Sequence, residues 1–91
     1  MSLLHIEPEN LRATSRRLSQ MAEEIDWQIQ RLENTKRILQ TAWQGSSRLQ
    51  FEAEIDRRLH TLRRLSHEVS ELSVRLQREA VKWEEIGYTL R

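Results

Sequence analysis

Apolar residues recur every seven positions through the first half of the chain. The series consists of Leu11, Leu18, Ile25, Leu32 and Leu39. Other apolar residues lie three or four positions away, and most charged residues fall on the opposite side of the resulting stripe. This period is typical of an amphipathic helix that packs against other helices. Because Pro8 suits the first turn of a helix, the pattern predicts a helix over about residues 8–43.

A second series with the same spacing occupies the other half of the chain. It consists of Ile55, Leu62, Val69, Leu76, Trp83 and Leu90, with further apolar residues three or four positions away. The series predicts a second helix over about residues 47–90. Neither half shows the alternation of period two that indicates strands, so the predicted fold class is all-α.

The two series are separated by a short segment with strong turn signals. Trp43, Gln44 and Gly45 are followed by two serines. Glycine accepts positive φ without steric cost and commonly ends a helix. Ser47 and Gln50 have the spacing of a capping box at the start of the next helix. We therefore expect a turn at residues 43–46 and an antiparallel two-helix hairpin with an indole at its tip.

The predicted apolar stripes are wider than one neighbouring helix can cover. Several hundred Å² of apolar surface left in water would forgo roughly 10 kcal/mol at about 25 cal/mol per Å², which is comparable with the stability of a small domain. We therefore predict that two chains pair into a four-helix bundle, either as a homodimer or as a heterodimer with a related chain. The predicted dimer core is Leu11, Leu18, Ile25, Leu32, Leu39, Ile55, Leu62, Val69 and Leu76.

The ends of such a bundle depend on how the two hairpins are oriented. Within one hairpin, Trp83 lies at the far end from Trp43. If the hairpins pair head to tail, the turn of one chain lies beside the open end of the other. Trp43 and Trp83 of the partner subunit would then form a composite end.

Composition excludes several classes of protein. The 91 residues include 15 Lys and Arg, 14 Asp and Glu, and no cysteine, giving a formal net charge of +1. A balanced charge provides no general attraction to nucleic acids or anionic membranes. Without cysteine the chain has no disulfide or thiolate site. Residues 1–10 lack the basic and apolar regions of a cleaved signal peptide, and no apolar run is long enough to span a bilayer.

The sequence contains no pattern of catalytic or ligand-binding residues. His60 and His67 are seven positions apart, which is about 10 Å along a helix and too far for two ligands of one metal ion. Adjacent acidic residues such as Glu84 and Glu85 point apart on a helix and cannot act as an acid–base pair. Gly-rich phosphate loops and nucleophile motifs do not occur. We expect no enzymatic activity, no cofactor, no metal and no small-molecule substrate.

Two other functions remain open from the residues alone. Arg57, Arg58, Arg63 and Arg64 form a basic patch that would suit an RNA-binding bundle, although acidic residues on both sides favour a solvated, charge-balanced face. The heptad pattern would equally suit a coiled-coil dimerisation or adaptor module that is not itself exported.

The central motif and the overall layout resemble a known family. Trp43-Gln44-Gly45 at mid-chain, Phe51 eight residues after the tryptophan, the opening segment at residues 6–13 and the chain length are similar to the WXG family of small helical-hairpin proteins, relatives of the early secreted antigenic target of mycobacteria. The resemblance implies a dimeric four-helix bundle that type VII (ESX) secretion exports without a cleaved signal. It also implies a role as substrate, co-export partner or adaptor, with Trp43 and Gly45 as a recognition motif.

One feature of the family pattern is incomplete in this sequence. Family members often carry Tyr-Xaa-Xaa-Xaa-Asp/Glu after the second helix, whereas Tyr88 is followed by Thr89, Leu90 and Arg91. The signal is therefore expected to be trimmed, absent or supplied by a partner. The resemblance makes Trp83 and Tyr88 candidate contacts for the partner or for the membrane ATPase of the secretion system.

Overall fold

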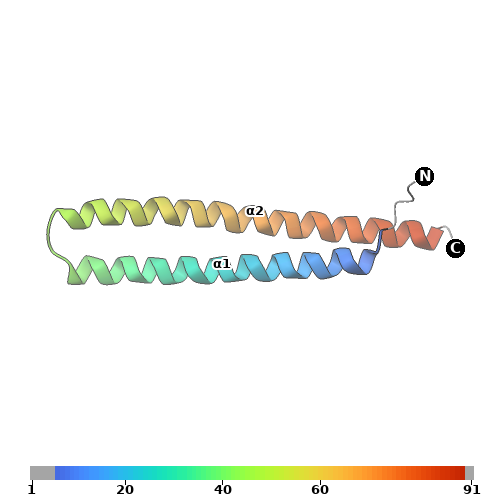
Figure 1. Ribbon diagram of the computed structural model, residues 1–91, viewed down its shortest axis with the longest axis horizontal. Coiled ribbons are helices and arrows are strands. Elements are labelled where there is room, and N and C mark those ends of the chain that lie inside the picture. The colour runs from blue at the N-terminus through green and yellow to red at the C-terminus, as the bar shows by residue number, and fades with distance from the viewer. Residues whose placement is uncertain (1–5, 90–91) are drawn as a thin grey trace.

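The computed structural model describes residues 6–89 and consists of two long antiparallel helices (Figure 1). Helix α1 spans Pro8–Ala42, helix α2 spans Ser47–Thr89, and the molecule extends 70 Å along its longest axis. Helix α2 continues past the start of α1 at the open end. The predicted antiparallel hairpin is confirmed. Leu90, the last member of the second apolar series, lies outside the described residues.

Large aliphatic residues fill the seam between the helices in the half nearer the turn. Ile29, Ile55 and Leu59 are buried there, and each is at most 8% exposed. Four partly buried residues pack against this cluster: Ile25, Leu32, Leu39 and Leu62. Because residues 6–89 form only these two helices, this narrow cluster is the centre of the hydrophobic core that they share.

Small residues fill the seam in the half nearer the open end. The buried residues there are Ser15, Ala22, Ser66, Ser73 and Ala80, with Val69 as the one larger member. Ser15 and Ser73 exchange hydrogen bonds, each hydroxyl donating to the other residue's carbonyl oxygen at 2.8 Å. Both buried hydroxyls are therefore satisfied, which removes the main cost of placing serine in a core.

Cross-helix polar contacts line one flank of the seam, which we call the polar side. From the open end towards the turn, they join Arg12 to Glu84 (2.8 Å), Asp26 to Ser66 (2.6 Å), Glu33 to Arg63 (2.6 Å) and Lys36 to Asp56 (2.7 Å). The three ion pairs among these contacts alternate in sign along the helices. They fix the register of α2 against α1 over almost the whole length of the hairpin.

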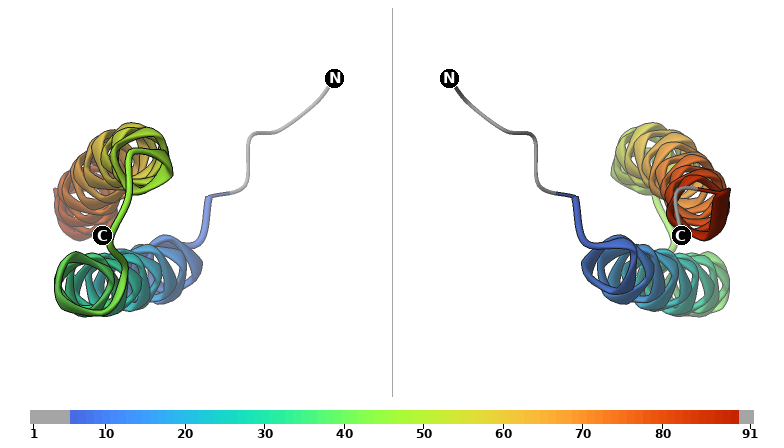
Figure 2. Two further views of the ribbon diagram at one scale, coloured as in Figure 1. Left: turned by 90° about the vertical axis from the view of Figure 1, so that its left-hand side faces the viewer. Right: turned by 90° about the vertical axis from the view of Figure 1, so that its right-hand side faces the viewer.

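The opposite flank of the seam, which we call the apolar side, is not covered. Viewed from either end, each helix has only the other as its neighbour (Figure 2). On α1 this side carries the predicted series from Leu11 to Leu39, all partly exposed. On α2 it carries Phe51, Leu65 and Leu72, which are 43–48% exposed. The hairpin therefore buries only part of each apolar stripe.

Candidate partner-binding surfaces

The turn places a glycine where only glycine is unstrained. Helix α1 ends at Ala42, and the backbone N–H of Trp43 donates to the Leu39 carbonyl at 2.9 Å. Gly45 has a φ of +138°, a region that residues with a Cβ avoid. Helix α2 then starts at Ser47, closed by a backbone hydrogen bond from Leu49 to Ser46 at 3.2 Å.

The predicted capping box at the start of α2 is not formed. Ser47 is itself the first helical residue, so it does not occupy the preceding N-cap position. Within the described residues, neither the Ser47 hydroxyl nor the Gln50 amide makes a hydrogen bond. The backbone of Gly45 and Ser46 instead supplies the acceptors for the first turn.

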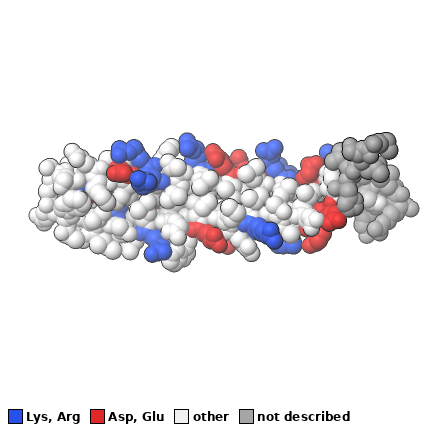
Figure 3. Space-filling model, in the orientation of Figure 1, with Lys and Arg blue, Asp and Glu red and all other residues white. Residues whose placement is uncertain are grey.

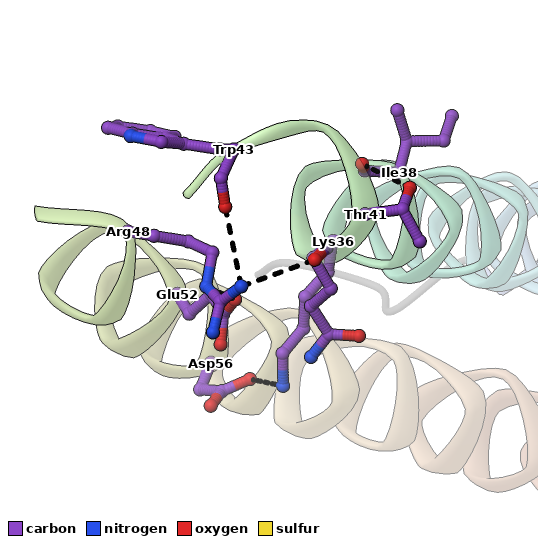
Figure 4. A network of polar contacts seen from close by, with 8 residues as sticks. Lys36, Ile38, Thr41, Trp43, Arg48, Glu52 and Asp56 are labelled. Atoms are coloured by element: carbon purple, nitrogen blue, oxygen red, sulfur yellow. Dashed lines mark hydrogen bonds and ion pairs between the residues drawn. The ribbon is translucent and has the colours of Figure 1, made fainter. Parts of the chain in front are cut away.

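Arg48 holds the turn together (Figure 4). Its Nη1 donates to the carbonyl oxygens of Gln40 and Trp43 at 3.2 and 3.3 Å. Helix α1 has no basic residue in its own last turn, so Arg48 supplies the positive charge that stabilises a helix C-terminus. The Arg48 Nε lies 3.1 Å from Glu52 Oε1, and the Glu52 side chain is only 14% exposed.

The indole of Trp43 lies at the tip of the hairpin. It is half-buried and contacts Phe51 of α2, with ring centroids 5.6 Å apart and planes tilted by 51°. Such tilted aromatic pairs are favourable beyond the area they bury. Trp43 therefore has a fixed position with one part of its ring system still accessible.

The other candidate aromatic residues lie at the opposite end of the molecule. Trp83 is half-buried on α2, and its indole N–H donates to Glu79 Oε1 at 3.3 Å. Tyr88 belongs to the last turn of α2, but its side chain lies outside the described part of the structure. A single hairpin does not bring Trp43 and Trp83 together.

The residues predicted as dimer core fall into two groups. Ile55 and Val69 are 5% and 8% exposed and lie within the seam of the hairpin itself. The other seven remain partly exposed on the apolar side of the hairpin: Leu11, Leu18, Ile25, Leu32, Leu39, Leu62 and Leu76. Only this second group has apolar surface left to offer to a partner.

Open grooves run between the helices on the apolar side. One, of about 340 Å³, is lined by Leu18, Leu72, Arg75, Leu76 and Glu79. Another, of about 380 Å³ and closer to the turn, is lined by Leu32, Thr35, Phe51, Glu54, Ile55 and Arg58. Grooves bordered by aliphatic ridges suit the side chains of a further helix.

The arginines of the basic patch are mostly paired with acidic residues. Arg58 contacts Glu54 at 3.1 Å, Arg63 contacts Glu33 at 2.6 Å, and Arg64 lies 3.9 Å from Glu68. Basic and acidic side chains also alternate along the face shown in Figure 3. This arrangement provides no continuous positive surface of the kind that binds a phosphate backbone.

The described residues offer little for chemistry or for a membrane. Among residues 6–89, no three His, Cys, Asp or Glu side chains gather where they could hold a metal ion. Neither helix contains a stretch within those residues that is long and apolar enough to cross a bilayer.

Sequence reasoning missed Arg48 and the small residues of the seam. The signal for Arg48 was the lack of any basic residue at the end of α1, which leaves its carbonyl oxygens to be satisfied from elsewhere. The signal for the seam was a second heptad column of small residues, which includes Ser66, Ser73 and Ala80.

The chain is similar to solved structures of one secreted protein. The wild-type secreted protein EsxB of Bacillus anthracis strain Sterne has a TM-score of 0.83 at 26% identity, covering 93% of this chain and 99% of that one. The selenomethionine-labelled EsxB has a TM-score of 0.84 at 25% identity, covering 96% and 99%. None of the curated proteins compared with the chain matches it.

A family match covers the same length of the chain. Residues 3–86 match the family described as proteins of 100 residues with WXG, WXG100. The matched range contains both helices of the hairpin almost entirely, together with the turn that presents Trp43 and Gly45. The chain belongs to the WXG100 family.

Proposed function

We propose that this chain is a small secreted protein of the WXG type, a substrate or co-export partner of a type VII (ESX) secretion system. It is exported without a cleaved signal peptide and acts through protein–protein contacts. Members of the WXG100 family are not enzymes. The observation that carries the proposal is the likeness to secreted EsxB over 93% of this chain and 99% of that protein.

The uncovered apolar side supports a paired form for export. A partner hairpin, either a second copy or a related WXG protein, covers the grooves and completes a four-helix bundle. Head-to-tail pairing then places the turn with Trp43, which Arg48 holds in position, beside the segment of the other chain that contains Trp83 and Tyr88. The membrane ATPase of the secretion system binds this composite end, which neither hairpin has alone.

The test is export of a Trp43→Ala variant from cells that carry the secretion system. We expect the exported fraction to fall at least about tenfold, while the melting temperature falls by only a few degrees, since Trp43 is half-buried and packs mainly on Phe51. Trp27→Ala is the matched control, because Trp27 is 57% exposed on the outer surface of α1. Its export should equal that of the wild type.

Two outcomes would contradict the proposal. If both tryptophan variants are exported like the wild type, Trp43 is only a structural residue of the turn. If the wild-type chain stays in the cell although the secretion system is active and the chain is dimeric, it acts instead as a dimerisation module that is not exported.

A further inference from the structure

The pairing of charges within α2 changes after residue 71. Up to that point, basic side chains contact a carboxylate four positions away in these cases: Arg48 with Glu52, Arg58 with Glu54, Arg64 with Glu68, and His67 with Glu71. The next three basic residues are Arg75, Arg78 and Lys82. All three are exposed, and none makes a hydrogen bond or an ion pair with another residue among 6–89. This end of α2 therefore carries three cations that the hairpin leaves unpaired.

The carboxylates within reach of Arg75 make other contacts. Glu71 lies four positions before Arg75 but contacts His67 at 3.1 Å. Glu79 lies four positions after Arg75 but accepts a hydrogen bond from the indole of Trp83 at 3.3 Å. Helix α2 thus contains acidic residues at the right spacing for Arg75, and neither of them neutralises it.

Arg78 lies at the centre of this group. Its neighbours three and four positions away on α2 are two cations, Arg75 and Lys82, and two valines, Val74 and Val81. Cations at these spacings repel one another and lower the stability of a helix, so their grouping does not serve the fold. The two valines are 45% and 38% exposed. We call these five residues the Arg78 patch.

The Arg78 patch faces away from α1. Val69 and Ala80, which are buried in the seam, lie about half a turn around the helix from Arg78. A partner on the apolar side therefore leaves the centre of the patch open, although Arg75 also lines a groove of that side. Beside Val74 lies a shallow hollow of about 390 Å³ that is lined by side chains of α2 alone. The patch thus combines unpaired cations with a recess bordered by an exposed valine.

The spacing within the patch matches the repeat of a helix. Val74 and Val81 are seven residues apart, as are Arg75 and Lys82, and each pair spans about 10 Å along α2. A second helix that packs alongside α2 can present aliphatic side chains to the valines at the same repeat. Carboxylates one turn further along that helix then lie beside the cations.

The surroundings of the patch disfavour an extended anionic surface. Glu71 and Glu85 lie seven residues before and after Arg78 in the same column of α2. A phosphate chain or an anionic membrane that follows the helix would meet these carboxylates about 10 Å from Arg78. The exposed valines also add apolar surface that gains from contact with an aliphatic side chain. A helix whose acidic residues span only about two turns fits both features.

We propose that the Arg78 patch is a docking surface that binds an acidic amphipathic helix of another protein through its two valines and three cations. Carboxylates of the partner neutralise charges that the hairpin leaves unpaired, so binding relieves the repulsion around Arg78. The patch lies on a different side of the molecule from the apolar side that a second hairpin would cover. The inference therefore goes beyond the proposed function and does not depend on export.

A designed peptide tests the surface on the purified full chain. The probe is a fluorescent, stapled helical peptide of about three heptads, with leucine at every seventh position and glutamate four residues after each leucine. The reference peptide has glutamine in place of every glutamate. Fluorescence anisotropy at low ionic strength should show the acidic peptide binding at least about tenfold more tightly than the neutral one.

Two variants with the same loss of charge locate the binding. Arg78→Gln combined with Lys82→Gln removes two cations of the patch, whereas Arg17→Gln combined with Arg57→Gln removes two cations elsewhere. Arg17 and Arg57 are likewise exposed and make no hydrogen bond or ion pair within residues 6–89. The patch variant should bind the acidic peptide at least about tenfold more weakly than the wild type, and the control within about twofold. The patch variant should melt no lower than the wild type, because it loses like-charge neighbours.

A third variant tests the apolar part of the patch. Val74→Thr combined with Val81→Thr keeps the branching of both side chains and removes a methyl group from each. Both positions are exposed, so the melting temperature should stay close to that of the wild type. The affinity for the acidic peptide should fall at least about threefold, because less apolar surface is buried.

Several results would overturn the inference. If the acidic peptide does not bind, or binds no better than the neutral one, the cations do not select an acidic helix. Equal weakening by both charge variants would mean that the attraction comes from net charge and not from the patch. A lower melting temperature of the patch variant would assign its cations to the fold. Binding of single-stranded RNA or phosphatidylglycerol vesicles that the patch variant loses and the valine variant keeps would replace the helix by a phosphate-bearing partner.

Discussion

At the scale of single residues, the turn depends on one side chain that reaches back to the preceding helix. The last carbonyl oxygens of α1 need donors, and the guanidinium of Arg48 provides them from the first turn of α2. Its ion pair with the largely buried Glu52 fixes the guanidinium in turn. The position of Trp43 is therefore set by both helices, which suits a residue that a partner must recognise.

The two glycines of the chain should respond in opposite directions to alanine. Gly45 has a φ of +138°, so Gly45→Ala should lower the free energy of unfolding by about 1–3 kcal/mol. Gly87 lies within α2, has an ordinary helical backbone, and has open space around the position of a Cβ. Gly87→Ala should raise the free energy of unfolding by about 0.5–1 kcal/mol.

Denaturant titration at equal protein concentration measures both variants. Open space surrounds a Cβ at either glycine, so steric clash cannot account for a difference between them. A loss of stability of similar size in both variants would contradict the role assigned to the backbone of Gly45.

At the scale of the elements, the seam combines large residues near the turn with small residues near the open end. The heptad series and Gly45 were sufficient to predict both helices and the turn, because these signals are local. The small column was not predicted, because Ser15 gains its meaning only from its hydrogen bonds with Ser73, 58 positions away. Sequence spacing likewise could not show that Ile55 lies in the seam while Leu62 lies at its edge.

The Arg12–Glu84 pair at the open end should make the stability of the hairpin sensitive to acid. The hydrogen bond from Arg12 lowers the pKa of Glu84 below its ordinary value. As the pH falls, the Glu84 carboxylate therefore becomes protonated in the unfolded chain at a higher pH than in the folded chain. The ion pair contributes fully to the free energy of unfolding above the unfolded pKa of glutamate, about 4.3. This contribution is lost as the pH drops through the lower pKa of Glu84 in the folded chain.

Replacing Glu84 by glutamine removes this titration. The wild type should lose more stability than Glu84→Gln on going from pH 6 to pH 3, as followed by denaturant titration at each pH. Glu23→Gln serves as a control for the loss of one carboxylate on an exposed helix surface. Identical acid profiles for the wild type and Glu84→Gln would show that the ion pair does not contribute in solution.

At the scale of the whole molecule, the hairpin has two unlike sides. Alternating cross-helix ion pairs occupy the polar side, whereas half-buried leucines and open grooves occupy the other. The width of the apolar stripes predicted this asymmetry in general terms. The division between the seam and the free surface required the observed register of α2 against α1, which contacts such as Glu33–Arg63 and Lys36–Asp56 show.

Ile25 provides the sharpest test of the apolar side. It is only partly buried within the hairpin, and it lies on the apolar side at the middle of α1. Ile25→Asp would bury an unpaired carboxylate from each chain, so the dissociation constant should rise at least about 100-fold. The conservative change Ile25→Leu should alter it by less than about tenfold.

Trp27 separates the effect of position from the effect of exposure. Trp27 is more exposed than Ile25, at 57%, and the guanidinium of Arg31 lies 4.9 Å from its ring centre. Yet it lies on the side of α1 that faces away from the seam, where neither α2 nor a partner on the apolar side reaches it. Sedimentation equilibrium should therefore show Trp27→Asp dimerising like the wild type while Ile25→Asp dissociates. Equal dissociation of both variants, or of neither, would mean that the apolar side is not where the partner binds.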